Sequence, residues 1–304
     1  MATLANDLTE SDRHSLSELS QLAIRAIRET GINRTTHVEA AGRGLGHYWL
    51  LSFPGSPKKR VRPVNSRLFV FDPADLERLT DQLQNVMKHI AVKRDRNSAR
   101  TTWRPFFDAN GLARSLYTIQ QAISIALDLL LPDNQARKRA GQYFEDLFSS
   151  ILDLLDVSQR RINFRLPVPR LDGTTFNIEV DRVLNTRGSV RSTPTKIDPA
   201  DLLVSLKTSS KDRFSKLFVD NTMAERITEM PMKLLAVFHN DIQRTRSDGV
   251  SVTFLAQQFL VYTEYLSRLS GVYYVDPPAH SVKDPWKRWL KPIDDLLLED
   301  LWKL

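Results

Sequence analysis

The fold of this protein is decided by the stretch Asp201-Leu202-Leu203-Val204-Ser205-Leu206-Lys207-Thr208-Ser209-Ser210-Lys211-Asp212-Arg213-Phe214. Its first half is a predicted strand, because a run of leucine and valine follows Pro199 and ends at a Thr-Ser-Ser turn. Side chains alternate along a strand, so Ser205 and Lys207 lie on the face opposite Leu206. Burying an ammonium group without a partner is costly. The stretch therefore predicts an anionic group beside Lys207; the alternative is a lysine that simply reaches water where the strand ends.

A second strand is predicted upstream, over Phe176-Asn177-Ile178-Glu179-Val180-Asp181-Arg182-Val183-Leu184. Apolar and polar residues alternate along it, which places Glu179 and Asp181 together on one face. If this strand pairs with the strand that ends at Lys207, the acidic face and the lysine meet at one end of a sheet. The two runs together indicate a cluster of carboxylates around a lysine.

The nine residues Ser205-Leu206-Lys207-Thr208-Ser209-Ser210-Lys211-Asp212-Arg213 carry a resemblance to a known family. A carboxylate on one strand, with Ser-x-Lys or Glu-x-Lys on its neighbour, is the core of the PD-(D/E)XK nuclease arrangement. The chain resembles the branch of type II restriction endonucleases that recognise CCGG or CCNGG sites. Ser205 stands where most members of the superfamily have an acid. Residues 271–278 are similar to the last core strand of several such enzymes, so the resemblance covers about residues 137 to 278.

The resemblance implies two further acids on helices. In that branch the helix after the lysine strand supplies the missing acid, thirteen or fourteen residues beyond the lysine. Asp220 lies thirteen residues beyond Lys207, and is an Asp where a Glu is usual. Because the shorter side chain reduces its reach, Glu225 stays open as the helix acid. The family also has a Glu on the helix before the first strand, and Glu145 lies thirty-six residues ahead of Asp181.

The implied chemistry is Mg²⁺-dependent hydrolysis of phosphodiester bonds. Oxygen ligands suit Mg²⁺, which keeps several waters and uses one or two carboxylates together with the substrate phosphate. Asp181 is expected as the principal ligand and Asp220 as the second. Glu145 is expected as an outer or second-ion ligand, and Glu179 is an alternative because it shares a strand face with Asp181. Lys207 is expected to orient the attacking water and to stabilise developing negative charge.

The tripeptide Lys211-Asp212-Arg213 is a candidate for reading DNA bases. In the major groove, guanine offers two acceptors, which an Arg or Lys can bind, and cytosine offers one donor, which an Asp can accept. The tripeptide therefore holds both halves of a C·G code, directly after the catalytic strand. The alternative is an ordinary helix N-terminus with Asp212 as its cap or first-turn acid.

Composition agrees with a soluble DNA-binding protein. The chain has 304 residues, of which 41% are hydrophobic and 26% are charged, and its formal net charge of +7 favours a polyanionic partner. It contains no cysteine, so neither disulfides nor thiolate metal sites are available and a cytoplasmic location is expected. No run of apolar residues is long enough to predict a membrane span.

Strands that alternate with helices predict an α/β (α+β) fold, a restriction-endonuclease-like core with a central mixed sheet flanked by helices. This core is expected over residues 132–304, after a mostly helical region over residues 1–131 for DNA contact or dimerisation. The expected partners are double-stranded DNA, a second copy of the chain and a methyltransferase of the same system. The second copy is expected because cutting both strands of a near-palindromic site needs two active sites. A structure-specific repair or recombination nuclease and a non-catalytic basic DNA-binding protein are the alternative functions.

Overall fold

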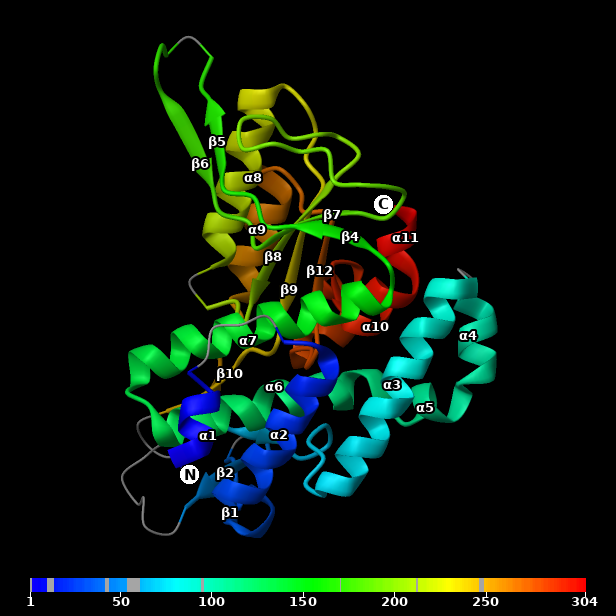
Figure 1. The fold of residues 1–304 in the computed structure, drawn as a ribbon. Helices are drawn as coiled ribbons and strands as arrows, with labels where there is room; N and C mark the ends of the chain where they lie inside the picture. Colours follow the sequence, from blue (N-terminus) through cyan, green and yellow to red (C-terminus); the bar gives the residue numbers. More distant parts are fainter. Residues whose placement is uncertain are drawn as a thin grey trace. The chain divides into compact units, whose positions relative to one another are not determined.

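The computed structural model describes residues 2–9, 14–41, 44–53, 61–93, 96–169, 171–211, 213–245 and 249–304. The chain forms two compact units (Figure 1). The first comprises Met1–Leu155 with Ile242–Val252, and the second comprises Asp156–Asp241 with Thr253–Leu304. The functional division at residues 131 and 132 stays a prediction, whereas the compact units divide between Leu155 and Asp156.

The first unit is mostly helical. Its helices are α1 (Ala2–Asp7), α2 (Leu16–Thr30), η1 (Ile32–Arg34), α3 (Pro73–Lys93), α4 (Arg96–Thr102), α5 (Arg104–Asp108), α6 (Gly111–Leu130) and α7 (Asp133–Leu154). Helix α2 begins at a capping box in which Ser15 and Glu18 satisfy each other's backbone amides. Helix α6 contacts α2, α3 and α7, so it is buried along most of its length and forms the centre of this unit.

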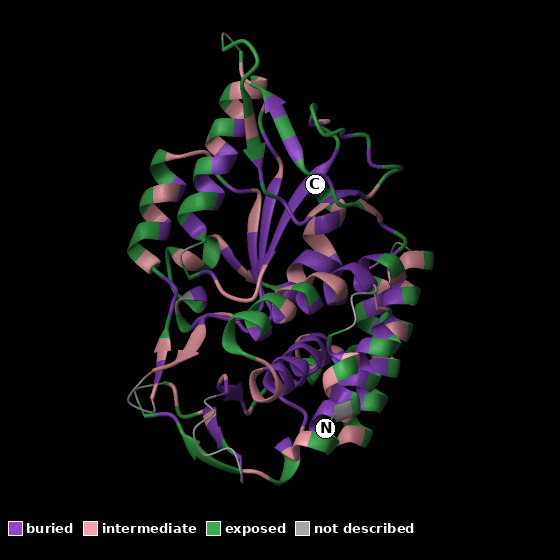
Figure 2. Cartoon of the chain, turned by 60° about the vertical axis from the view of Figure 1, so that its left-hand side comes forward, coloured by how far each residue is buried: buried purple, intermediate pink, exposed green. Residues whose placement is uncertain are grey.

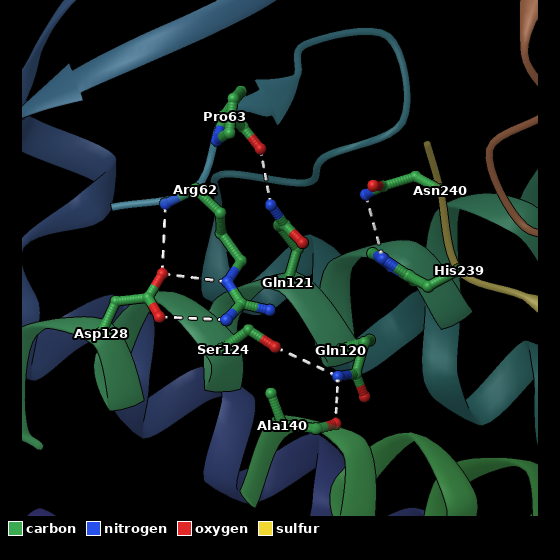
Figure 3. Close-up of polar contacts among 9 residues, drawn as sticks. All are labelled: Arg62, Pro63, Gln120, Gln121, Ser124, Asp128, Ala140, His239 and Asn240. Carbon is green, nitrogen blue, oxygen red and sulfur yellow. Dashed lines mark hydrogen bonds and ion pairs between the residues drawn. The ribbon is translucent and has the colours of Figure 1, made fainter. Parts of the chain in front are cut away.

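Polar side chains of α6 tie it to its neighbours (Figure 3). The Arg62 guanidinium donates to both oxygens of Asp128, at 2.9 and 3.0 Å. Gln120 donates to the Ala140 carbonyl of α7 at 2.8 Å, and Gln121 donates to the Pro63 carbonyl. Buried polar groups need such partners, because an unpaired group loses its bonds to water without replacement.

Two small antiparallel sheets complete the first unit. One has the order β1 (Thr36–Glu39), β2 (Tyr48–Ser52) and β3 (Val64–Asn65), and the other pairs β10 (Ile242–Arg244) with β11 (Val250–Val252). Val250 packs with Ala40, Tyr48 and Leu50, which places the β10–β11 hairpin in this unit although it comes late in the chain.

The second unit is built on a six-stranded mixed sheet in the order β13-β12-β9-β8-β7-β4. Its strands are β4 (Ser158–Arg160), β7 (Arg182–Asn185), β8 (Leu202–Lys207), β9 (Leu234–Phe238), β12 (Gly271–Tyr274) and β13 (Leu290–Pro292). β8, β9, β12 and β13 are parallel, whereas β7 runs antiparallel to β8 and β4. The four inner strands β7, β8, β9 and β12 are almost wholly buried, whereas the edge strands β4 and β13 are partly exposed (Figure 2).

Helices flank this sheet. On one face, α8 (Phe214–Thr228) and α9 (Ala256–Tyr265) place Phe214, Phe218 and Phe259 in one cluster with Leu203 and Phe238. The C-terminal segments lie on the other side of β12 in Figure 1; they are α10 (Ile293–Asp295), η4 (Leu296–Asp300) and α11 (Leu301–Lys303). The leucines of these segments are buried. Two short turns, η2 (Ala279–Val282) and η3 (Trp286–Arg288), precede them. The predicted α/β fold with a central mixed sheet is confirmed.

The prediction of one continuous strand over residues 176–184 is wrong. The run is divided into β6 (Thr175–Ile178), which pairs with β5 (Phe164–Pro167) in a separate projecting hairpin (Figure 1), and β7, which begins at Arg182. The apolar side chains of the hairpin belong to the same hydrophobic cluster as those of α8. The chain therefore leaves the two-stranded β5–β6 sheet before it enters the six-stranded sheet at β7. Asp181 lies at this junction, where its amide donates to the Val204 carbonyl of β8 at 2.9 Å.

Among the described residues, no helix is both long enough and apolar enough to cross a membrane.

Candidate active site

Asp181 and Lys207 form the centre of the candidate site. The Lys207 Nζ lies 2.7 Å from Asp181 Oδ2 and 3.0 Å from Asp181 Oδ1. The antiparallel pairing of β7 with β8, which aligns Arg182 with Val204, brings the two residues together. The anionic partner that the strand pattern predicts for Lys207 is thus Asp181, and the lysine does not simply extend into water.

Two further groups on β8 hold the Asp181 carboxylate. The Leu206 amide donates to Asp181 Oδ2 at 2.7 Å, and the Ser205 hydroxyl lies 3.4 Å from the same oxygen. Ser205 is completely buried. A second carboxylate at position 205 would face Asp181 at close range, and like charges at such a distance repel each other strongly. Serine instead supplies a hydroxyl donor at this position.

Asp220 is a buried carboxylate on α8. Its side chain is 7% exposed, and in the described part of the chain it takes part in no hydrogen bond or ion pair that holds its oxygens. Burial raises the pKa of Asp220, the positive charge of Lys216 lowers it, and the negative charge of Glu179 raises it further. The positive charge of Lys216 therefore offsets only part of the cost of ionising this buried carboxyl group.

Glu179 links Asp220 to Lys207 electrostatically. It forms an ion pair with Lys216, which is the main reason that its pKa lies below the ordinary value, and the charges of Lys207 and Arg213 add to this effect. Glu179 is well exposed. Asp181 contacts Lys207 directly, whereas Glu179 interacts electrostatically with both Lys207 and Asp220.

Glu225, the alternative helix acid, has a structural partner. Its Oε1 accepts a hydrogen bond from the Met232 amide at 2.9 Å, beyond the end of α8. A carboxylate that satisfies a backbone amide there stabilises the exit from the helix. Asp220, which has no such bond in the described chain, is the better candidate for the helix acid.

Glu145 lies on α7, in the first compact unit, and is partly exposed. The other predicted site acids lie in the second unit. Its role as a ligand stays a prediction.

Lys211 and Arg213 are both exposed at the start of α8, whereas Asp212 lies outside the described residues. The Arg213 amide donates to the Ser210 carbonyl at 2.9 Å, and the Lys211 amide donates to the Ser209 hydroxyl at 3.1 Å. Two cations therefore stand at fixed backbone positions within six residues of Lys207.

The fold of this chain is similar to that of a solved protein structure. No protein-family model matches the sequence, and no curated protein matches it. The structure is similar to that of the Type IIP restriction endonuclease Kpn2I, with a TM-score of 0.73 and 16% sequence identity, over 100% of this chain and 97% of that chain. The chain has the fold of a restriction endonuclease. It also matches the restriction endonuclease PspGI in complex with substrate DNA, with a TM-score of 0.40 and 9% identity, over 61% of this chain and 77% of that chain.

Within this restriction-endonuclease fold, the donor set of the site fits Mg²⁺. Asp181 and Asp220 offer only oxygen ligands, and Mg²⁺ binds through one or two carboxylates while it keeps its waters. Asp220, whose buried carboxylate is only partly balanced by Lys216, is the kind of group that a cation would stabilise. Among the described residues, no group of three or more His, Cys, Asp or Glu side chains could hold a metal ion.

Asp241 is not among the site residues that the sequence predicts. It directly follows the segment His239-Asn240 after β9, and it accepts hydrogen bonds from the turn that follows Lys207. The available signal was an aspartate just beyond the end of an apolar strand. That signal alone is common in proteins, because polar residues usually follow buried strands.

Proposed function

We propose that this protein is a type II restriction endonuclease, an Mg²⁺-dependent enzyme that hydrolyses phosphodiester bonds at specific sites in double-stranded DNA. The observation that carries the proposal is the contact of Lys207 with both oxygens of Asp181, beside Ser205, in a fold shared with Kpn2I. The net charge of +7 is favourable for a polyanionic substrate.

Asp181 and Asp220 would hold the ion. When bound, Mg²⁺ supplies a water of lowered pKa and neutralises charge on the phosphate. Within the protein, Asp181 fixes the position of the Lys207 ammonium. That ammonium has three N–H donors, two of which bind Asp181, so the third can orient an attacking water or donate to a phosphate oxygen as negative charge develops.

Lys211, Asp212 and Arg213 would read a half-site that contains CC paired with GG. Lys211 and Arg213 are exposed, and the turn that carries them is continuous with the catalytic strand. Reading and cutting would then be held in one rigid unit, which favours accurate positioning. The recognised site is proposed to be of the CCGG or CCNGG type.

The proposed enzyme acts in the cytoplasm as a homodimer. Two copies of one active site are needed to cut both strands of a near-palindromic site. A DNA methyltransferase of the same restriction system would protect the host sites, and no direct contact with this chain is implied.

The test is digestion of unmethylated phage DNA, followed by sequencing of the product ends. We expect discrete fragments with Mg²⁺ whose ends map to one site with a CC/GG step, and no cleavage in EDTA. Cleavage at branched or flapped structures without a sequence preference would establish a structure-specific nuclease instead. DNA binding that weakens with salt, without cleavage under any condition, would establish a non-catalytic DNA-binding protein.

A further inference from the structure

Asp241 is a buried carboxylate whose two oxygens bind different parts of the second unit. Its side chain is 1% exposed. Oδ1 accepts hydrogen bonds from the Ser210 amide and the Ser210 hydroxyl, both at 2.7 Å, and from the Thr253 hydroxyl at 3.0 Å. Oδ2 accepts a hydrogen bond from the Tyr274 hydroxyl at 2.6 Å. In the described chain, no lysine, arginine or histidine forms an ion pair with it.

The turn held by Oδ1 lies between the two functional parts of the proposed enzyme. It follows Lys207, and it precedes Lys211 and Arg213 at the start of α8. The Ser210 carbonyl accepts from the Arg213 amide, and the Ser209 hydroxyl lies 3.4 Å from Asp241 Oδ1. Asp241 therefore fixes the short segment that sets the spacing between the lysine and the exposed cations.

The other end of β8 carries a matching arrangement. Asp201, also 1% exposed, precedes the strand, and its Oδ2 accepts from the Ser192 amide and hydroxyl, both at 2.7 Å. Asn185 donates to its other oxygen at 2.8 Å. The same serine–aspartate contact thus occurs at both ends of one strand, but the Asp201 contact lies at the end away from Lys207.

We propose that Asp241 is a positioning residue that holds the Ser209–Ser210 turn, so that Lys207 and the pair Lys211 and Arg213 act on the same bound DNA site. This inference rests on the proposed function. Burial raises the pKa of Asp241, and the hydrogen bonds from Tyr274, Ser210 and Thr253 oppose this effect by favouring its ionised form. Hydrogen bonds to an ionised acceptor are shorter and about twice as strong as neutral ones. A neutral side chain at position 241 would therefore hold the turn more loosely without changing its shape.

Two pairs of variants test the proposal: Asp241→Asn with Asp201→Asn, and Ser210→Ala with Ser192→Ala. For each, kcat/KM is measured on a duplex with the cognate site and on one with a single altered base pair, and Tm is measured in parallel. We expect Asp241→Asn and Ser210→Ala to lower the ratio of the two rates at least tenfold. Asp201→Asn and Ser192→Ala should lower Tm and leave the ratio within twofold of the wild type.

A change in Tm alone for Asp241→Asn and Ser210→Ala, with an unchanged ratio, would show a purely structural role and overturn the proposal. An equal fall in the ratio for Asp201→Asn would overturn it as well, because the effect would not depend on the turn. Ser210→Ala removes one hydroxyl and keeps the backbone amide, so it decides the matter if Asp241→Asn does not fold. A wild-type protein that cuts no DNA would instead remove the proposed function, and the inference with it.

Discussion

Lys207 Nζ lies within 3.0 Å of both oxygens of Asp181, so one ammonium bridges the whole carboxylate. The side chain of Asp181 is almost fully buried, and that of Lys207 is about one-fifth exposed, at 21%. Within this ion pair, solvent therefore reaches the Lys207 side chain more readily than the Asp181 carboxylate. A substrate phosphate would therefore meet the N–H groups of Lys207.

The first prediction concerns Asp181→Ala, Lys207→Ala and the double variant. Each single change should lower the cleavage rate by several orders of magnitude, because both side chains serve the transition state. The cleavage rate of the double variant should lie within about tenfold of the rate of the slower single variant. The effects of mutating residues that act as a unit are strongly non-additive. Rates that multiply in the double variant would show that the two act independently. Single-turnover cleavage of a cognate duplex measures all three.

The second prediction separates the two candidate helix acids. Asp220→Asn should abolish cleavage, whereas Glu225→Gln should retain a rate within about threefold of wild type. The Glu225 carboxylate accepts from the Met232 amide, and glutamine keeps an acceptor oxygen, so the free energy of unfolding should fall by less than the roughly 0.5–1.5 kcal/mol of a whole hydrogen bond. Urea unfolding and plasmid cleavage give both quantities. The opposite ranking in cleavage would assign the helix acid to Glu225.

The third prediction concerns stability at different pH values. Burial raises the pKa of Asp220, so ionising this carboxyl costs stability in the folded state. This loss of stability is absent below the ordinary aspartate pKa. It grows as the pH rises from that value and is complete above the raised pKa of Asp220. Asp220→Asn should therefore unfold at a higher temperature than wild type at neutral pH, and this gain should vanish below about pH 4. A gain that is unchanged at acid pH would exclude titration of Asp220 as its cause.

The fourth prediction follows Mg²⁺ without reference to activity. A ligand that binds only the folded state raises its stability by RT ln(1 + [L]/Kd), where [L] is the concentration of free ligand. The Tm of wild type should rise with added Mg²⁺ and return to its starting value in excess EDTA. Asp181→Ala should show no rise, and Glu225→Gln should behave like wild type. An equal rise in all three proteins would place the ion elsewhere on the surface.

The fifth prediction tests base reading. Arg213→Ala should reduce discrimination at one guanine by about 1–3 kcal/mol, which is the usual value of a bidentate contact to a base. Arg226, an exposed arginine in the last turn of the same helix, provides the matched control. Arg226→Ala should leave discrimination unchanged. Equal loss of affinity for all DNA sequences on Arg213→Ala would make this residue a phosphate contact.

The carboxylate beside Lys207 could be predicted from local sequence, because alternation along a strand fixes which side chains share a face. A lysine at the end of an apolar strand then requires a partner, and Asp181 stood on the only other strand-like run with an acidic face upstream. The extent of that second strand could not be predicted. Its first half pairs with β5, and the hydrophobic alternation is the same whether a strand joins one sheet or another.

The role of Asp241 could not be predicted from local sequence. The groups that bind it lie 31, 12 and 33 residues away in the sequence, on Ser210, Thr253 and Tyr274. No periodicity connects such positions, because the contacts arise only when the parallel strands β8, β9 and β12 are placed side by side. The spacing that points to Asp220 came from the family resemblance, and its role as a ligand stays a prediction.

The β10–β11 hairpin belongs to the first compact unit, although it is encoded between two segments of the second. The order of synthesis therefore matters for folding. When residue 155 has been made, Ala40, Tyr48 and Leu50 still lack the side chain of Val250 that packs on them. At about 5–20 residues per second, the ribosome needs on the order of 5–20 seconds more to deliver it. During that interval the nascent chain carries an uncovered apolar surface, so slow translation between the two units would prolong its exposure to chaperones and to aggregation.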